Sequence, residues 1–297
     1  MPRSTNTPSL VYQVKRRLEE QARFGESKHQ AKQRAKREAE QRGEKWNPSQ
    51  VEGIYSFETM RTYMRQGAHF VKWVRERHPE VKWLEDARRY IPEYLSQYQS
   101  AWTVRTKANA LAKIYGCKST ELGVQLPKRD LHAIKRSRRP AKRDVSFSET
   151  RNKDLVDFCR GTGLRRKELQ ALRPEDVYQA ANGRVFVHVR SGKGGRTREV
   201  PVLLKYQDRV WEIAQRAKAN NLPRVFPTVP LGADIHSYRR EYAQATYMET
   251  VERLPSNVTK EYYNTKDGLH FERHAMKFVT KALGHNRLEV AARNYLR

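Results

Sequence analysis

The chain has 297 residues, and 60 Lys and Arg against 33 Asp and Glu give it a formal net charge of +27. That length fits about two domains, and so one-sided a charge repels itself unless a polyanion is near, so nucleic acid is the expected partner. A membrane or secreted protein is not expected, because no apolar run approaches the roughly 18 residues of a spanning helix and the start MPRSTNTPSL lacks the apolar stretch of a signal peptide. The expected location is the cytoplasm.

Residues 1–48 are expected to form a basic helical arm. From Leu10 to about Lys45 the sequence is dense in Lys, Arg, Glu and Gln, and Gly25 is the single glycine before Gly43. Such a segment has little apolar surface to bury, so it is either a DNA-contacting appendage or a solvent-exposed helix. Its surplus of basic residues favours contact with DNA.

Residues 49–127 predict a compact, all-helical DNA-binding domain. Apolar side chains recur at helical spacing through this stretch, and breaks at His78, at Gln97 to Ser100 and at Gly116 divide it into three or four short helices. Its aromatic residues share the periodicity of the core, so we expect core packing rather than stacking on bases.

Residues 128–145 have the composition of an extended basic linker. The sequence from Lys128 to Asp144 holds eight basic residues against two acidic ones, with Pro140 near its end. A linker this basic is expected to lie along DNA phosphates. The side chains assigned to this contact are Lys128, Arg129, Lys135, Arg136, Arg138, Arg139, Lys142 and Arg143.

Residues 146–297 are expected to form a second domain of mixed type. Ser146 and Glu149 make an S-x-x-E capping box, which predicts that the first helix of this domain begins here. Alternation at Val185, Val187 and Val189 predicts a strand, and a turn then leads to its antiparallel partner. The further predicted elements are helices at Arg165 to Leu172, Tyr206 to Ala219, His236 to Glu252, Arg273 to Leu283 and Arg287 to Tyr295, the partner strand at Thr197 to Leu203, and a hairpin at Val258 to Leu269.

Cutting and resealing a DNA strand without a metal ion or ATP requires a covalent intermediate that conserves the bond energy. A tyrosine hydroxyl can act as the nucleophile. Charge spreads over the non-bridging phosphate oxygens in the transition state, so fixed cations must hold them, preferably arginines with their planar forks. An acid must also protonate the leaving oxygen.

Five segments of the sequence carry these residue types in one order. Gly161 to Leu169 reads GTGLRRKEL, Ser191 to Arg196 reads SGKGGR, Ile235 to Ala243 contains a His-x-x-Arg box, Leu283 to Asn286 reads LGHN, and Asn294 precedes a tyrosine. Together they resemble the conserved boxes of the tyrosine recombinases, the phage integrase family. The matched positions are Arg165, Lys193, His236, Arg239, His285 and Tyr295.

The resemblance implies a fold and an assembly. We expect a mainly α fold with small β-hairpins, in which an all-helical N-terminal core-binding domain joins a mixed α+β tyrosine recombinase catalytic domain. Two such domains would close around double-stranded DNA at specific sites. Four copies of the chain would form the synaptic complex, with accessory DNA-bending proteins as possible further partners, and the protein would be associated with the bacterial nucleoid and come from a mobile element.

Roles carried over from the family follow box by box. Arg165 and Arg239 would hold the scissile phosphate, and His285 would donate a hydrogen bond to it. His236 would orient or deprotonate the nucleophile. Tyr295 would attack to form a 3′-phosphotyrosyl link, and Lys193 in the hairpin turn would act as general acid on the leaving 5′ oxygen. Arg196, in the same turn, is expected to contact DNA.

The sequence departs from the usual family pattern in two places. A second His-x-x-Arg, at His270 and Arg273, competes with the box at His236 and Arg239; we favour the earlier box because a long predicted helix follows it. Only two residues follow Tyr295, whereas many relatives have a tail that docks on the neighbouring subunit, which leaves the coupling between subunits open.

The same composition and helices also suit functions other than recombination. A non-catalytic DNA-binding architectural protein on the same scaffold, or a type IB topoisomerase, would suit the same charge and helices. An ATP site is not expected, because the turn at Lys193 is followed by Gly194 where the Walker pattern needs Ser or Thr. Cys117 and Cys159 have no partner at ligand spacing, so no metal or cofactor is expected and both are predicted core residues.

Overall fold

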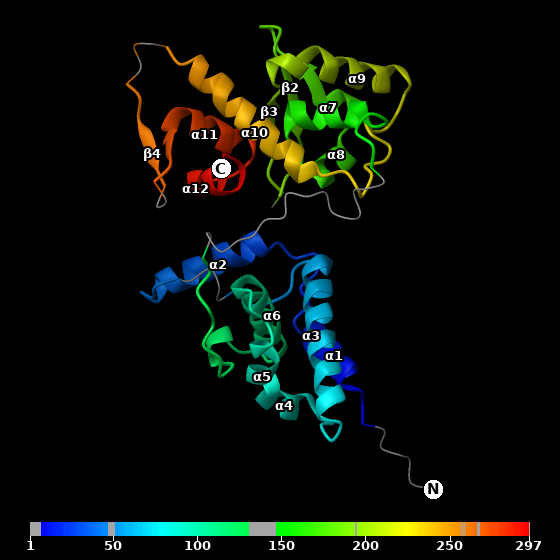
Figure 1. The fold of residues 1–297 in the computed structure, drawn as a ribbon, viewed down its shortest axis with the longest axis vertical. Coiled ribbons are helices and arrows are strands. Elements are labelled where there is room, and N and C mark those ends of the chain that lie inside the picture. Colours follow the sequence, from blue (N-terminus) through cyan, green and yellow to red (C-terminus); the bar gives the residue numbers. More distant parts are fainter. Residues whose placement is uncertain are drawn as a thin grey trace. The chain divides into compact units, whose positions relative to one another are not determined.

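The computed structural model describes residues 7–46, 51–130, 147–193, 195–255, 257, 259–265 and 268–296. The chain divides into two compact units, residues 1–136 and 137–297 (Figure 1). Most of the expected linker, including Lys135, Arg136, Arg138, Arg139, Lys142 and Arg143, lies outside the described residues.

The N-terminal unit is helical in its described part. Serine hydroxyls at positions 9, 27 and 56 accept hydrogen bonds from backbone N–H groups of the first turn and so fix where the first three helices begin. The helices are α1 (Leu10–Glu19), α2 (Lys28–Gln41), α3 (Phe57–Arg77), α4 (Leu84–Ala87), α5 (Ile91–Ser96) and α6 (Ala101–Ile114). The last four fall between the breaks predicted from the sequence.

Helix α1 corrects the expectation of a separate arm. Its residues Leu10, Val14 and Leu18 are buried, because their spacing of four places them on one face, and that face packs on α3 and α6 within the N-terminal core. Helix α2 is the polar helix that was expected, and Ala39 is its one buried residue among those described. The polar segment is therefore shorter than predicted, since only α2 has the predicted character.

The aromatic residues of this unit divide between core and surface. Phe70, Trp73 and Tyr94 are buried in the core, as the periodicity predicts. Trp83 and Trp102 are exposed, so the core prediction is wrong for these two. Cys117 is half-buried, whereas Cys159 of the C-terminal unit is buried as expected.

In the C-terminal unit, helices surround a small sheet in which strands β1, β2 and β3 lie side by side and antiparallel (Figure 1). Strand β2 alternates buried and half-buried residues, and Val187 pairs with Val200 of β3. The elements are α7 (Lys153–Thr162), α8 (Arg166–Ala171), β1 (Val177–Gln179), β2 (Val185–Val189), β3 (Arg198–Pro201), α9 (Gln207–Ala219), α10 (Ile235–Glu252), β4 (Tyr262–Asn264), β5 (His270–Glu272), α11 (Arg273–Ala282), α12 (Leu288–Ala291) and a π-helical turn (Ala292–Leu296). The mainly helical fold with small antiparallel sheets is confirmed.

Three details differ from the predicted elements. Strand β1 adds a third strand to the predicted hairpin. The second hairpin exists but pairs residues 262–264 with 270–272, a few residues later than predicted. The predicted capping box does not start a helix: α7 begins at Lys153, and the Glu149 carboxylate instead accepts hydrogen bonds from the Tyr238 hydroxyl, 2.9 Å away, and from Arg160. Ser146 lies outside the described residues.

Gly163 joins the first box to the central helix α10. It ends α7 with a left-handed φ of 58°, a conformation that glycine adopts at little cost. A Cβ at this position would come within 2.3 Å of the Tyr242 ring on α10, which is fully buried. The close approach of these two helices therefore requires the glycine of the GTGLR sequence.

We predict that Gly67→Ala destabilises the N-terminal unit, although alanine is the better helix former by about 1 kcal/mol. The new Cβ would lie 2.6 Å from Val14 on α1 and 2.7 Å from Ile114 on α6. Overpacking of this kind costs about 1–3 kcal/mol, so the free energy of unfolding measured in urea should fall. Arg65→Ala, at an exposed position of the same helix, is the control and should change it by less than about 0.5 kcal/mol. A rise in stability for the glycine variant would show that α1 does not pack as described.

Candidate active site

Two arginines from different elements meet at one backbone carbonyl. Arg165 caps α8, and its Nη2 donates to the Leu283 carbonyl oxygen at 3.2 Å. Arg239 lies on α10 with 1% of its surface exposed, and its Nη2 donates to the same oxygen at 2.6 Å. Arg239 also donates to the carbonyl of Gly163. The two guanidiniums therefore lie side by side, although 74 positions separate them in the sequence.

Tyr295 lies against this pair of arginines. Its hydroxyl accepts a hydrogen bond of 3.3 Å from Nε of Arg239, whose guanidinium carbon is 5.4 Å from the centre of the tyrosine ring. The His285 ring centre is 5.5 Å from that of Tyr295. Tyr295 itself is half-buried and lies in the π-helical turn that follows α12. Tyrosine, both arginines and one histidine are thus in one cluster.

His285 is held by its backbone and leaves one ring nitrogen unused. It follows Gly284, which has a φ of 65°, and its N–H donates to the Thr280 carbonyl at 2.8 Å. Its Nε2 is buried and has no hydrogen-bond partner among the described residues. Burial, and then the positive charges of Arg239 and Arg165, lower the pKa of His285 to about 4. The ring is therefore neutral near pH 7 and can donate one N–H.

His236 lies in the first turn of α10, one turn before Arg239. The Asp234 carboxylate caps this helix by accepting from the Ser237 N–H at 3.1 Å. Partial removal of water from the ring, and then the charge of Arg239, lower the pKa of His236 below its usual value. The side chain is exposed, so a substrate can reach it.

Lys193 and Arg196 lie in the turn between β2 and β3. Both are exposed, and the Gly192 N–H closes the turn by donating to the Arg196 carbonyl at 2.7 Å. The Arg196 guanidinium donates to the side-chain oxygen of Asn286, next to His285. This contact places the turn beside the segment that carries His285, and the charge of Lys193 makes a small contribution to the lowered pKa of that histidine.

Glu168 and Arg198 are the parts of the site that the sequence did not reveal. The Glu168 carboxylate, 6% exposed, accepts from Arg198 Nη1 and Nη2 at 2.9 and 2.8 Å and from Arg165 Nη1 at 2.9 Å. Nε of Arg198 donates to the Ala282 carbonyl at 3.0 Å. Burial alone would raise the pKa of Glu168, but the hydrogen bonds and charge of Arg198 outweigh it and hold the pKa at about 2. The sequence does contain one sign of the role of Glu168: it stands three residues after Arg165, the spacing of a capping box.

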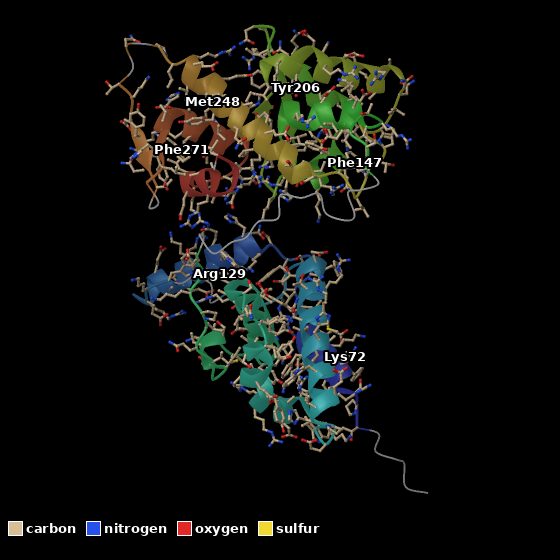
Figure 2. The ribbon with its side chains drawn as sticks, in the orientation of Figure 1. Lys72, Arg129, Phe147, Tyr206, Met248 and Phe271 are labelled. Carbon is tan, nitrogen blue, oxygen red and sulfur yellow. The ribbon has the colours of Figure 1, made fainter. Side chains whose placement is uncertain are left out.

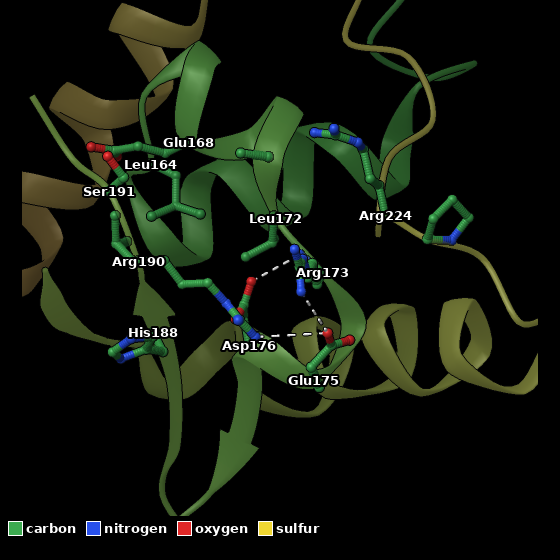
Figure 3. A pocket seen from close by; sticks show the side chains of 13 residues that line it. Leu164, Glu168, Leu172, Arg173, Glu175, Asp176, His188, Arg190, Ser191 and Arg224 are labelled. Atoms are coloured by element: carbon green, nitrogen blue, oxygen red, sulfur yellow. Dashed lines mark hydrogen bonds and ion pairs between the residues drawn. The ribbon is translucent and has the colours of Figure 1, made fainter. Parts of the chain in front are cut away.

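A cavity of about 550 Å³ adjoins Glu168 and Ser191 (Figure 3). The charged side chains that line it pair with one another: Asp176 accepts from Arg190, and Glu175 forms ion pairs with Arg173 and Arg190. These pairs neutralise much of its charge, which distinguishes this cavity from the arginine cluster beside it.

The competing box does not join the cluster. His270 lies on β5 and bonds to the side chain of Asn264 at 2.7 Å, while Arg273 begins α11 and pairs with Glu261 at 3.1 Å. His270 and Arg273 are exposed. Of the two competing arginines, Arg239 is the one that contacts Tyr295.

Two of the expected DNA contacts from the linker are described. Lys128 is exposed, and the Arg129 guanidinium, labelled in Figure 2, lies 4.5 Å from the centre of the Trp102 ring on α6. Arg105 holds the same segment by donating to the Pro127 carbonyl at 2.7 Å. The start of the linker is thus attached to the N-terminal unit.

Among the described residues, no group of His, Cys, Asp or Glu side chains could hold a metal ion. None of the described helices combines the length and apolar character that crossing a bilayer demands.

Comparison with known proteins identifies the class. The model of the phage integrase family matches residues 140–297, more than half of the chain. The XerH site-specific recombinase bound to palindromic difH substrate, a post-cleavage complex, is similar with a TM-score of 0.52, 15% identity, and coverage of 96% of this chain and 91% of that chain. Its pre-cleavage complex gives a TM-score of 0.51, 14% identity, and coverage of 96% and 92%. No curated protein matches the chain in sequence.

The fold and the family match together define a tyrosine recombinase. The chain belongs to the phage integrase family. The family match covers every segment that carries a member of the cluster, from Arg165 to Tyr295.

We predict that Glu168→Gln removes a pH-dependent part of the stability of the C-terminal unit. The carboxyl has a pKa of about 2 in the folded chain, below its ordinary value of about 4.5. Its contribution is therefore complete above about pH 5 and is lost as the pH falls toward 2, and it amounts to about 3 kcal/mol. The free energy of unfolding in urea, followed by hydrogen exchange of β2 and β3, should fall less steeply with acid in the variant.

The matched control is Glu212→Gln, whose carboxylate pairs with Arg209 at an exposed position of the same unit. It should leave the acid dependence nearly unchanged, because exposed pairs contribute little. Equal acid dependence in wild type and Glu168→Gln would contradict the buried carboxylate described here.

Proposed function

We propose that this protein is a site-specific recombinase that cuts and rejoins duplex DNA through a 3′-phosphotyrosyl intermediate. The observation that carries the proposal is the cluster of Arg165, Arg239, His285 and Tyr295, in which Arg239 donates to the tyrosine hydroxyl at 3.3 Å. A nucleophile beside two cations is what displacement at a phosphodiester requires.

The two arginines would bind the scissile phosphate. Each guanidinium carries five N–H donors, more than the contacts to Leu283, Gly163, Glu168 and Tyr295 use. The remaining donors are available to the non-bridging oxygens, where charge grows in the transition state. The unpartnered Nε2 of His285 supports a further contact to the same phosphate, made by a neutral ring.

The displacement involves one bond formed, one bond broken and two proton transfers. Tyr295 Oη forms a bond to phosphorus, and the bond from phosphorus to the 5′ oxygen breaks. The phenol proton passes to His236 or to water that this histidine orients, and Lys193 gives a proton to the departing 5′ oxygen. Attack by the free 5′ hydroxyl of another strand reverses these steps, which rejoins DNA and releases Tyr295.

The partner would be double-stranded DNA at specific sites. The net charge of +27 supports a polyanion, and the similar XerH structures are complexes with difH substrate. Lys128, Arg129 and Arg196 are exposed cations available to the DNA backbone. Exchange of strands between two sites would need four copies of the chain, and accessory DNA-bending proteins could align the sites.

We predict that Tyr295→Phe abolishes the covalent protein–DNA adduct and leaves DNA affinity within about threefold, since only the nucleophilic oxygen is removed. The substrate is a duplex library with a randomised core and a nick in one strand, from which a cleaved fragment diffuses away and traps the adduct. Denaturing gels measure the fraction of protein that is covalently linked to DNA, and mass spectrometry of the digested protein locates the modified tyrosine.

Tyr262→Phe, on the exposed strand β4, is the matched control and should form adduct at the wild-type rate. Adduct formation by Tyr295→Phe would overturn the assignment of the nucleophile. Wild-type protein that binds DNA but never forms an adduct would favour an architectural protein, and relaxation of supercoiled plasmid without a specific site would favour a type IB topoisomerase.

We predict that Lys193→Ala slows cleavage of ordinary DNA by about a hundredfold or more, because general acids contribute about 10²–10⁴. A substrate with sulfur in place of the 5′ bridging oxygen should restore the rate, since a thiolate leaves without being protonated. Arg239→Lys should not be restored by sulfur, because it weakens the phosphate clamp instead. Single-turnover rates on the selected site check both. A Lys193→Ala defect that sulfur does not relieve would exclude the lysine as the acid.

A further inference from the structure

Arg166, the residue after Arg165, makes four hydrogen bonds to one loop. Its Nη1 donates to the carbonyls of Val229 and Pro230 at 3.2 and 2.6 Å, and its Nη2 donates to those of Leu231 and Ala233 at 3.3 and 2.6 Å. The guanidinium is thus surrounded by backbone oxygens. Both terminal nitrogens of Arg166 are engaged by the loop, so the side chain has a structural role and is not simply a solvated surface charge.

The loop it holds leads directly into α10. Val229 and Ala233 are buried, but Leu231 between them is 83% exposed, so side-chain packing does not fix the middle of the loop. Helix α10 begins at Ile235, and His236 is its second residue. The orientation of the loop therefore sets where the first turn of α10 places His236.

Ile235 packs in the core at the start of α10, and the next side-chain hydrogen bonds of the helix to other elements are made by Tyr238, whose hydroxyl donates to Glu149, and by Arg239. Arg239, one turn later, is held by the carbonyls of Gly163 and Leu283. Asp234 caps the helix from within the same loop, so it moves with the loop and cannot anchor it. The hydrogen bonds of Arg166 tie the 229–233 loop, just before α10, to α8, the helix that presents Arg165.

We propose that Arg166 is a positioning residue for His236: it fixes the 229–233 loop so that the histidine reaches the Tyr295 hydroxyl and the phosphate. This inference rests on the proposed recombinase function. Adjacent arginines would then serve both histidines, because Arg165 bonds to the Leu283 carbonyl just before Gly284 and His285, while Arg166 bonds to the carbonyls just before His236.

The test compares Arg166→Met, which removes the donors, with Lys167→Met, which removes the same charge from the adjacent exposed position. Arg166→Met should lower the single-turnover rate of adduct formation about tenfold to a hundredfold, the range expected for a small misplacement of a catalytic group. DNA affinity in gel shifts should stay within about threefold, and Lys167→Met should match wild type in both. A wild-type cleavage rate for Arg166→Met overturns the proposal.

A double-mutant cycle separates positioning of His236 from general support of the fold. In a His236→Gln background, adding Arg166→Met should slow adduct formation by less than about twofold, because the group it positions is absent. The same fold loss in both backgrounds overturns the proposal. Arg166→Lys keeps the charge but loses the planar fork, so it should stay about tenfold or more below wild type, and it replaces Arg166→Met if that variant does not fold.

Hydrogen exchange without DNA gives an independent readout. Deuterium uptake of residues 229–236 should rise in Arg166→Met and stay unchanged in Lys167→Met, and unchanged uptake in both overturns the inference. Wild-type protein that forms no adduct on any duplex would defeat the proposed function instead, and the exchange experiment would still decide whether Arg166 holds this segment.

Discussion

The carboxyl-terminal end of α11 is the point on which the arrangement of the site depends. A helix ends with carbonyl oxygens that lack intrahelical partners and carry partial negative charge. Here the Ala282 carbonyl accepts from Arg198, and the Leu283 carbonyl accepts from both Arg165 and Arg239. One helix end therefore collects three guanidiniums from α8, β3 and α10.

The electrostatics of this cluster are unbalanced in a way that suits an anionic ligand. The three guanidiniums of Arg165, Arg198 and Arg239 are accompanied by one carboxylate, that of Glu168, which bonds to the first two. Burial, and then the neighbouring charge of Arg165, lower the pKa of Arg239 to about 10, and burial with the same charges keeps His285 neutral. Three positive charges against one negative charge leave the cluster at about +2, and a phosphodiester in the proposed reaction would lower this to about +1, so an anionic substrate would relieve part of the repulsion among the arginines.

The sequence patterns indicated the residues of the cluster more fully than the strands, helices and side chains that hold them in place. The order of boxes and the long helix after His236 selected Arg239 over Arg273, and the structure places Arg239 beside Tyr295. Strand β1 was missed because three residues are too short to show alternation. The sequence does not predict that α1 packs in the core, because its three buried residues stand among many charged ones.

The supporting arginines were missed for a different physical reason. Arg166 and Arg198 act on backbone carbonyls and on a distant carboxylate, at separations of 30 to 84 positions. Every residue has a carbonyl, so a partner of this kind leaves no mark in the sequence. Only the folded chain shows which loop or helix end comes within reach of a guanidinium.

Carbonyl partners also explain how the site remains cationic. A carboxylate on each arginine would hold the side chain firmly, but it would cancel the positive charge that would attract a phosphate in the proposed reaction. A carbonyl oxygen accepts a hydrogen bond without bringing a full negative charge, so Arg239 is fixed by Gly163 and Leu283 and still attracts an anion. Glu168 is the exception, and because Arg165 and Arg198 share it, it fixes two arginines while neutralising only one positive charge.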